Sequence, residues 1–405
     1  MTIAVSVEDK PDLGRMQRHR RARLQQAMAD QGADALVLLS NSNVSYATGA
    51  RWPLSDPGRA NVQRPVAVVT AGDDLPHLFT TFGELGAPDL GLPDDHVHGP
   101  VYPEFDEGAE SFARTVAELV PYGARVAVDE LPGSLNRVRV LFSPDAEPSS
   151  ADDVVGAAKL IKTPDELGFL RKALAITEQA IAPTQASLAP GMRQNELTAR
   201  FLRTAFELGA DANILDPIWQ VMPASVADGP WTTHGDIACP LLTTERELEV
   251  GDVLWVDTGI SYAGFASDFG RTWLVGTDPT PRQQAQFRAW SEIVEAVLAV
   301  TRAGATGADL TRAALSAHGR NRRPWMEHFY LGHGLGIESA EPPFIGTDLG
   351  DGYDERQVLA AGMVLVLEPL VWEDGAGGYR AEEVIAITED AWIPLTDYPY
   401  DPYGH

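Results

Sequence analysis

Cysteine is nearly absent from this chain, because Cys239 is the only one among 405 residues. A single cysteine excludes an intramolecular disulfide framework, so the fold has to be held together by apolar cores. The sequence also contains no apolar run of roughly 18 residues that could span a bilayer, and no basic start leading into a secretory signal. These absences predict a cytoplasmic protein.

Basic residues are scarce as well, with 31 Lys and Arg against 58 Asp and Glu and a formal net charge of −27. Such a charge repels phosphate backbones and anionic membrane surfaces at long range. We therefore expect neither nucleic acid nor a membrane as a partner. The 44% of hydrophobic residues is typical of a globular protein, and the length suits two domains.

The first part of the chain alternates short apolar runs with helical patterns, which is typical of an α/β domain. The pattern predicts a helix over residues 16–31 that ends at Gly32, and another over residues 107–119. Residues 41–49 are expected to form a loop. Buried strands are predicted at residues 35–40, 65–71, 76–82 and 124–130.

Residues 142–153 lose apolar periodicity and are the best candidate for a junction between domains. After them, Thr163 and Pro164 suit the N-cap and first position of a long helix, and Glu166 completes a capping box. The remainder of the chain shows mainly strand and hairpin patterns. Helices are expected there at residues 164–182, 194–208, 281–301 and 308–320.

One predicted hairpin, residues 253–273, carries an acidic residue on each strand. Asp257 and Asp268 lie about equally far from the turn residues 262–264, so the simplest register sets them opposite each other on one face. Directly opposed residues have Cβ atoms roughly 5 Å apart, and like charges at that spacing repel. The pair therefore indicates a cation between the two carboxylates, with an exposed acid pair as the alternative.

A second hairpin, residues 362–389, repeats this arrangement. A strand over residues 363–372 and another over residues 379–388 place Glu368 and Glu382 symmetrically about Gly375. The sequence thus offers four carboxylates in two opposed pairs.

A group of four carboxylates that binds divalent cations usually needs a nitrogen ligand or water to complete the shell. His333 is the candidate, because the glycines of GHGLG around it permit a close approach of the backbone. By itself a histidine beside glycines is more often a loop residue. Together with the four acids it becomes the fifth ligand candidate.

The ordered set of five residues resembles the metal site of the pita-bread metallopeptidases, which include methionine aminopeptidase, prolidase and aminopeptidase P. The motifs VDTG, SDFGRT, GHGLG, EP and R-x-E-E match as well, and residues 20–49 resemble the start of a creatinase-type domain. The resemblance implies an α/β creatinase-like domain over residues 1–158 and an α+β pita-bread catalytic domain over residues 159–405. The five residues that carry it are Asp257, Asp268, His333, Glu368 and Glu382.

The resemblance also implies two divalent metal ions, which could be Mn, Co, Zn or Fe. Asp257 would bind one ion, His333 and Glu368 would bind the other, and Asp268 and Glu382 would bridge both. A site of this kind suits a metallohydrolase that resembles Xaa-Pro dipeptidase and aminopeptidase P, in which a bridging water attacks the carbonyl of a peptide or small amide.

Three residues receive further roles from the resemblance. Glu368 would act as the general base, with a purely structural ligand as the alternative. His234, in TTHGD, resembles a histidine that contacts substrate and stabilises the tetrahedral intermediate, with a loop histidine as the alternative. Arg380 resembles the arginine that orients the bridging carboxylate and the substrate, with a surface arginine as the alternative.

Ala340 departs from the pattern, because prolidase-like chains usually carry a second histidine at that position. The absence of this histidine favours, as an alternative function, a pita-bread enzyme that acts as a hydrolase or lyase on a non-peptide small molecule. A binding module without catalysis is a third possibility, but such proteins lose metal ligands and this chain keeps all five.

Relatives that form dimers imply a homodimer here. In those dimers a loop of the first domain reaches toward the partner's active site, and Asn43, Tyr46 and Trp52 lie in the corresponding segment of this chain.

Overall fold

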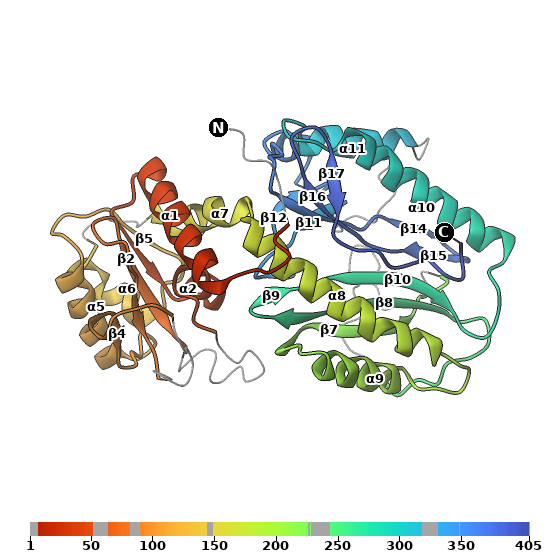
Figure 1. Cartoon of the computed structure of the whole chain (residues 1–405), viewed down its shortest axis with the longest axis horizontal. Coiled ribbons are helices and arrows are strands. Elements are labelled where there is room, and N and C mark those ends of the chain that lie inside the picture. Colours follow the sequence, from red (N-terminus) through yellow and green to blue (C-terminus); the bar gives the residue numbers. More distant parts are fainter. Residues whose placement is uncertain are drawn as a thin grey trace. The chain divides into compact units, whose positions relative to one another are not determined.

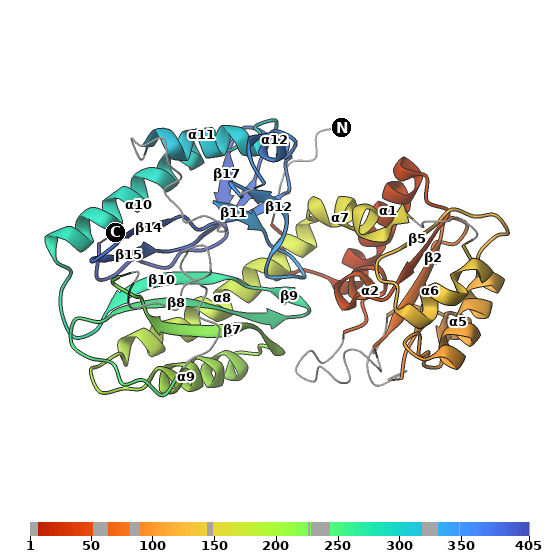
Figure 2. The same ribbon diagram turned by 180° about the vertical axis from the view of Figure 1, so that it is seen from behind.

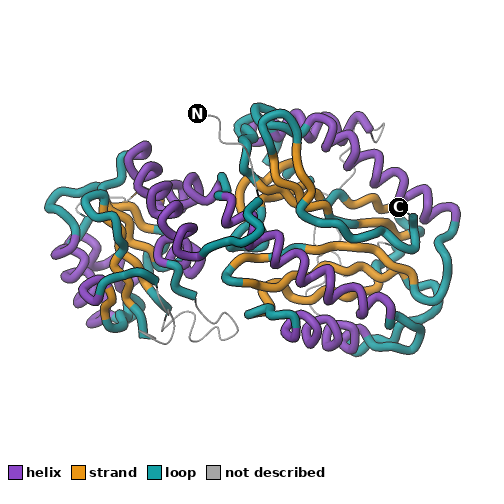
Figure 3. Tube along the Cα trace, viewed as in Figure 1, coloured by secondary structure: helices purple, strands orange, loops and turns teal. Residues whose placement is uncertain are grey.

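The structure, a computed structural model, describes residues 7–51, 64–81, 90–143, 149–225, 227, 244–317, 331–347 and 349–404. The chain forms two compact units, Lys10–Asp165 and, chiefly, Glu166–His405. In both units helices lie beside the strands that they cover (Figure 3). A compact unit need not fold by itself, so the predicted domain boundary between residues 158 and 159 stays a prediction.

The first unit contains a mixed six-stranded sheet in the order β4-β3-β2-β1-β5-β6. β1 pairs antiparallel with β2 and parallel with β5, which makes β1 a central strand. The four predicted strands are confirmed as β1, β2, β3 and β5, each shorter than expected. The strands are β1 Ala35–Leu38, β2 Val66–Thr70, β3 His77–Phe79, β4 Val97–His98, β5 Val126–Val128 and β6 Ser149–Ser150.

Helix α1 begins and ends at residues with clear capping roles. α1 (Leu13–Gln31) begins after Asp12, whose side chain accepts the N–H of Arg15, and ends at Gly32 with a φ of 71°. Phe112 of α5 packs into the core of the sheet. The other helical segments are α2 Asn41–Thr48, η1 Asp94–His96, α5 Asp106–Leu119, α6 Gly133–Val138, η2 Arg139–Leu141 and α7 Ala151–Leu160.

Residues 41–48 form helix α2, so the prediction of a loop at 41–49 is wrong. Ser40 occupies the N-cap, and Gly49 ends the helix with a φ of 84°. Asn and Ser fill half of this helix, and both favour turns over helices when no tertiary contacts act. Packing therefore overrides a local preference that the sequence shows.

Asn43 and Tyr46 are buried within α2. The Tyr46 hydroxyl donates to the carbonyl oxygen of Ala158 at 2.8 Å, and the Asn43 amide donates to Asp129 at 3.1 Å. The prediction that these two residues lie in a loop directed at a partner subunit is therefore wrong. Trp52, the third residue of that prediction, lies outside the described residues.

The segment that loses apolar periodicity continues the first unit. β6 pairs with β5 through Ala127 and Ser149, and α7 follows directly within the same unit. The first compact unit gives way to the second at Asp165, beyond residues 142–153.

The second unit contains two sheets and a two-stranded ribbon. The first sheet has the order β10-β8-β7, with β9 paired to β8, and the second has the order β12-β11-β13-β16-β17. The first sheet consists of β7 Ala212–Val221, β8 Val253–Tyr262, β9 Phe265–Ala266 and β10 Phe269–Leu274. The second consists of β11 Gly332–Gly334, β12 Glu341–Ile345, β13 Val364–Leu367, β16 Glu383–Ile387 and β17 Trp392–Pro394, and the ribbon of β14 Leu370–Glu373 and β15 Gly377–Arg380.

Four long helices of the second unit confirm the predicted ones. α8 crosses one face of the β7-β8-β10 sheet in Figure 1 and lies behind that sheet in Figure 2. Ile176 of α8 and Phe201 of α9 join Trp219 and Trp273 of the sheet in one apolar core. The helices are α8 Pro164–Ala186, α9 Gln194–Glu207, α10 Pro281–Val300, α11 Gly307–Ala317 and the short α12 Asp351–Asp354.

None of the helices in the described part of the chain has the length and apolar character needed to cross a membrane.

Candidate metal centre

The first acidic hairpin is formed by β8 and β10, with a two-residue turn at Ala263 and Gly264. Tyr262 pairs with Phe265, which leaves only these two residues in the turn. Their φ angles are 52° and 81°, both in the left-handed region, as a type I′ hairpin turn requires. The centre of the turn therefore lies one residue further along the chain than the midpoint between the two acids.

This turn changes the expected register. Asp257 pairs with Gly270, and Asp268 lies between β9 and β10, outside the regular ladder. The prediction that the two aspartates directly oppose each other is therefore wrong. Asp268 lies only two residues from the position opposite Asp257, however, and side chains two residues apart in a strand point to the same face.

The second acidic hairpin has the predicted register, centred on Gly375. Leu367 pairs with Glu383 and Leu370 pairs with Arg380, which confirms this centre. Each predicted long strand is divided into two, because the chain passes from the five-stranded sheet into the ribbon. Glu368 and Glu382 lie at the two breaks, outside the regular ladders.

The five ligand candidates come together in the second unit, and all are buried. Asp257, Asp268 and Glu382 each offer a ligand atom, and these atoms lie within 4.8 Å of one another. The Nε2 atom of His333 lies 2.9 Å from Glu368 Oε1 and 3.5 Å from Asp268 Oδ2. Their role as metal ligands stays a prediction.

Arg380 lies among these carboxylates and is only 3% exposed, which excludes the alternative of a surface arginine. Its guanidinium donates to Asp257 at 2.7 Å, donates to Glu368 and lies 3.2 Å from Glu382. It also lies over the ring of Trp255, 4.7 Å from the ring centroid. Arg380 therefore supplies positive charge and fixes the orientation of the acids.

Hydrogen bonds to backbone groups of the second hairpin attach it to β10. The N–H of Glu382 donates to the carbonyl of Gly270 at 3.0 Å, and the buried guanidinium of Arg271 donates to the carbonyl of Glu382 at 2.7 Å. The hydroxyl of Thr272 donates to the carbonyl of Arg380 at 2.6 Å. The two hairpins are thus held together at their acidic residues.

Sequence reasoning assigned no role to Gly270, Arg271 or Thr272, although it noted the motif SDFGRT. A signal was present, because Arg271 is a charged residue within the otherwise buried strand FGRTWL. A buried arginine inside a strand needs several acceptors, and carbonyl groups of a neighbouring segment are the usual ones.

Burial and mutual repulsion shift the acid–base properties of the centre. Burial, reinforced by the charge of Asp257, raises the pKa of Asp268 to about 8. Burial and the charges of Asp268 and Asp257 also raise the pKa of Glu382 well above its usual value. In the absence of a bound cation, the carboxylates with these raised pKa values therefore retain protons at neutral pH.

His333 and Glu368 form an ion pair within the same cluster. Burial opposes the charge of His333, but the Glu368 carboxylate beside it raises the pKa of His333 to about 9. Burial likewise opposes the charge of Glu368, yet Arg380 and His333 together lower its pKa. Glu368 is therefore the carboxylate of the centre that stays ionised most readily.

The side chains fit divalent cations. Within the described part of the chain neither carboxylate oxygen of Glu382 accepts a hydrogen bond. Its Oε1 atom has the ion pair with Arg380 at 3.2 Å, and a buried carboxylate that is compensated only in part is costly. Nδ1 of His333 lies 2.9 Å from the carbonyl oxygen of Gly334, which leaves Nε2 directed at Asp268 and Glu368. Metal-binding histidines are commonly oriented by such a carbonyl.

His234 lies outside the described residues. Ala340 is exposed and directly precedes β12, which begins at the buried Glu341.

Comparison with known proteins gives the family of the chain. Residues 168–389, more than half of the chain, match the profile of metallopeptidase family M24. The chain belongs to this family. Residues 20–158 match the creatinase/prolidase N-terminal domain, so the predicted order of an α/β creatinase-type domain and an α+β pita-bread domain is confirmed for this M24 protein.

Similar proteins cover nearly all of the M24 chain. The Xaa-Pro dipeptidase of Pyrococcus horikoshii is 25% identical over 90% of this chain and 92% of its own length. That of Pyrococcus furiosus is 29% identical, but the match spans 60% of this chain and 65% of the relative. The X-Pro aminopeptidase structure from Thermotoga maritima has a TM-score of 0.74 at 22% identity, covering 94% and 98% of the two chains, and shares the fold.

Gly270 is required for the position of Glu382. A Cβ atom at Gly270 would lie 2.6 Å from Oε1 and 2.8 Å from Cγ of Glu382, so Gly270→Ala forces this carboxylate away. We expect the variant to bind Mn²⁺ at least about tenfold more weakly in calorimetric titration. Gly156→Ala is the control, because no atom lies within 4 Å of the added Cβ there. A folded Gly270→Ala variant with full affinity would contradict this role.

Metal binding should strengthen as pH rises. A cation displaces the protons of Asp268 and His333, whose pKa values are raised to about 8 and about 9. Raising the pH from about 6 to about 9 removes these protons, so the apparent affinity should increase about tenfold per pH unit for each proton displaced. Titrations in buffers of different ionisation enthalpy measure the protons released. An affinity that stays constant over this range would rule out the raised pKa values.

Proposed function

We propose that this M24 protein is a metal-dependent hydrolase that cleaves the amide bond before proline in Xaa-Pro dipeptides or short peptides. The observation that carries the proposal is the buried convergence of Asp257, Asp268 and Glu382, with ligand atoms within 4.8 Å of one another. His333 and Glu368 adjoin this group. The relatives named Xaa-Pro dipeptidase support the substrate class.

Five residues would hold two divalent cations. Asp257 would bind one ion, His333 and Glu368 the other, and Asp268 and Glu382 would be shared. When bound, such a pair of ions lowers the pKa of a water toward neutrality and polarises a carbonyl oxygen. An oxygen-rich set with one imidazole accepts Mn, Co, Zn or Fe, and availability selects among them.

Glu368 is the residue that would take up a proton. Arg380 and His333 lower its pKa, so it is ionised at neutral pH and able to accept a proton. The same two neighbours fix its two oxygens in place, since His333 contacts Oε1 and Arg380 contacts Oε2. Glu368 can then pass the proton to the leaving amine.

Arg380 would position the cluster and the substrate. Its guanidinium contacts three of the four carboxylates. The Thr272 hydroxyl donates to the backbone carbonyl of Arg380 and accepts the backbone N–H of Arg380. His234 is proposed to contact the substrate, on the sequence pattern alone. A homodimer is proposed on the same resemblance, and a cytoplasmic location because the sequence contains no apolar run that could span a bilayer.

Ala340 supports a second substrate class. Without a histidine at this position, a donor that stabilises the developing oxyanion in related peptidases is missing, a contribution worth about 3 kcal/mol. A pita-bread enzyme acting on a non-peptide small molecule would not need it. The dipeptidase names of the relatives favour the first class, and the assay below separates the two.

The test compares substrates on the metal-restored protein. Metal-free protein should be inactive, and adding Mn²⁺, Co²⁺, Zn²⁺ or Fe²⁺ should restore cleavage of an Xaa-Pro dipeptide but not of the matched Xaa-Ala dipeptide. Glu368→Gln should lower kcat by about 100-fold or more, because the proton acceptor is lost. Glu373→Gln on the same hairpin is the control, since the Glu373 side chain is 42% exposed and pairs only with Arg282 among the described ion pairs.

Three outcomes would decide against the proposal. Equal cleavage of Xaa-Pro and Xaa-Ala would refute proline specificity. No peptide cleavage, with cleavage of a non-peptide amide, would select the second class. No bound metal and no activity after adding each of the four ions would exclude a metallohydrolase altogether.

A further inference from the structure

A group of three histidines and one aspartate lies in the first unit. None of the five ligand candidates of the metal centre belongs to this unit. His77 begins β3, His96 ends η1 and His98 ends β4. Asp73 lies in the turn between β2 and β3. The sequence carries nine histidines, and three of them fall within residues 77–98, a concentration that indicates a common binding site.

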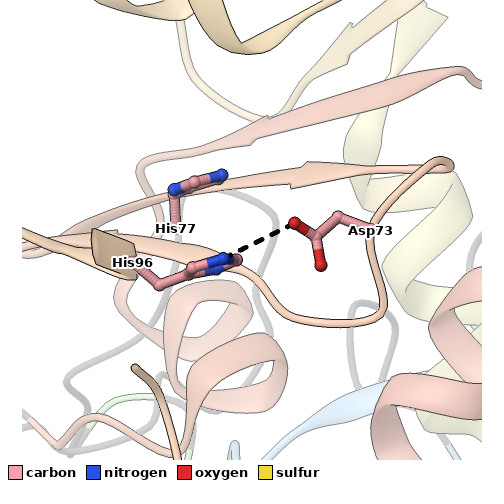
Figure 4. A group of neighbouring side chains, drawn as sticks. All are labelled: Asp73, His77 and His96. Atoms are coloured by element: carbon pink, nitrogen blue, oxygen red, sulfur yellow. Dashed lines mark ion pairs between the residues drawn. The ribbon is translucent and has the colours of Figure 1, made fainter. Parts of the chain in front are cut away.

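The side chains of Asp73, His77 and His96 lie close together (Figure 4). The rings of His77 and His96 stack, with centroids 4.2 Å apart and planes within 5° of parallel. Nε2 of His96 lies 3.5 Å from Oδ2 of Asp73. One ligand atom from each of Asp73, His77 and His96 lies within 4.8 Å of the other two.

The remaining ring nitrogens have their own partners. Nδ1 of His77 lies 3.0 Å from Nε2 of His98, and Nδ1 of His96 lies 3.3 Å from the carbonyl oxygen of Pro76. A proton on each Nδ1 satisfies these contacts and places the lone pair of each ring on Nε2. A carbonyl or a second base behind the ring is the usual way in which a protein orients a metal-binding histidine.

We propose that Asp73, His77 and His96 form a second metal site, for an ion that prefers imidazole, such as Zn²⁺, Ni²⁺ or Cu²⁺. Two imidazoles and one carboxylate are the donors that such ions select, whereas the centre of the second unit offers one imidazole among four carboxylates. Three protein ligands leave one tetrahedral position for water. The stacked rings have to turn toward each other so that both Nε2 atoms reach one ion.

The site would tie the edge of the sheet together. β4 has only two residues and is held to β3 by the pairs Leu78–Val97 and Phe79–His98. An ion on Asp73, His77 and His96 would link the β2–β3 turn and the start of β3 to η1, which leads directly into β4. An edge strand this short gains order from such a link.

A different account is that the group is only a stack of half-buried rings. The ion pair of His96 and Asp73 is weak in that case, because the Asp73 side chain is 39% exposed and surface ion pairs contribute little. The two accounts differ in the number of ions bound and in the nitrogens that bind them.

Copper is the probe for the test, because its EPR spectrum reports the nitrogens bound to it. Metal-free full-length protein is titrated with Cu²⁺ and compared with the His77→Gln/His96→Gln double variant. We expect the wild-type protein to bind one more equivalent, and the difference spectrum to show coupling to two nitrogens. His19→Gln, at an exposed histidine of α1, is the matched control and should keep the additional ion.

A second variant covers the case in which the double variant does not fold. Asp73→Asn removes a charge at a half-buried side chain and should lower the affinity for the additional ion at least tenfold, while the two-nitrogen coupling remains. The proposal is overturned if a folded double variant binds as many ions as the wild type, or if the difference spectrum lacks two nitrogens. Unchanged affinity in Asp73→Asn would remove Asp73 from the site. None of these results depends on peptidase activity.

Discussion

The second unit depends on the placement of three carboxylates, Asp257, Asp268 and Glu382, in one buried cluster. Burial penalises each negative charge, and each carboxylate repels the other two. The cluster is compatible with a folded chain only when positive charge or protons compensate it. Arg380 supplies part of this charge, and the raised pKa values of Asp268 and Glu382 show that protons supply another part. Divalent cations and protons therefore compete for the same oxygens, and this competition couples metal binding to pH.

The backbone holds the cluster against its own repulsion. β10 binds the segment around Glu382 through Gly270, Arg271 and Thr272, so neither hairpin can move away from the other without losing several buried hydrogen bonds. The breaks in the second hairpin place Glu368 and Glu382 outside the regular ladders. Rigid strands thus position the acids, and local irregularity directs them toward the cluster.

Four carboxylates of the centre were predicted because strand pairing brings together residues that are equally far from a turn, and His333 was added because glycines flank it. That argument succeeded for Glu368 and Glu382, whose hairpin is centred on Gly375. It misplaced Asp268 by two residues, because Ala263 adopts a positive φ that alanine rarely shows and so shifts the turn. Helix α2 was missed for a related reason, since its stability comes from buried contacts of Asn43 and Tyr46 that no local pattern shows. The histidine group of the first unit was also missed, because its members are brought together only when β3 and β4 pair.

Anomalous diffraction from crystals of the metal-loaded protein tests the central claim most directly. The account predicts two anomalous peaks in the second unit, both among Asp257, Asp268, His333, Glu368 and Glu382. Glu382→Gln, which removes one shared carboxylate, should lose at least one peak. A single peak in the wild-type protein at saturating metal would contradict the dinuclear centre, and peaks remote from these five side chains would contradict the account as a whole.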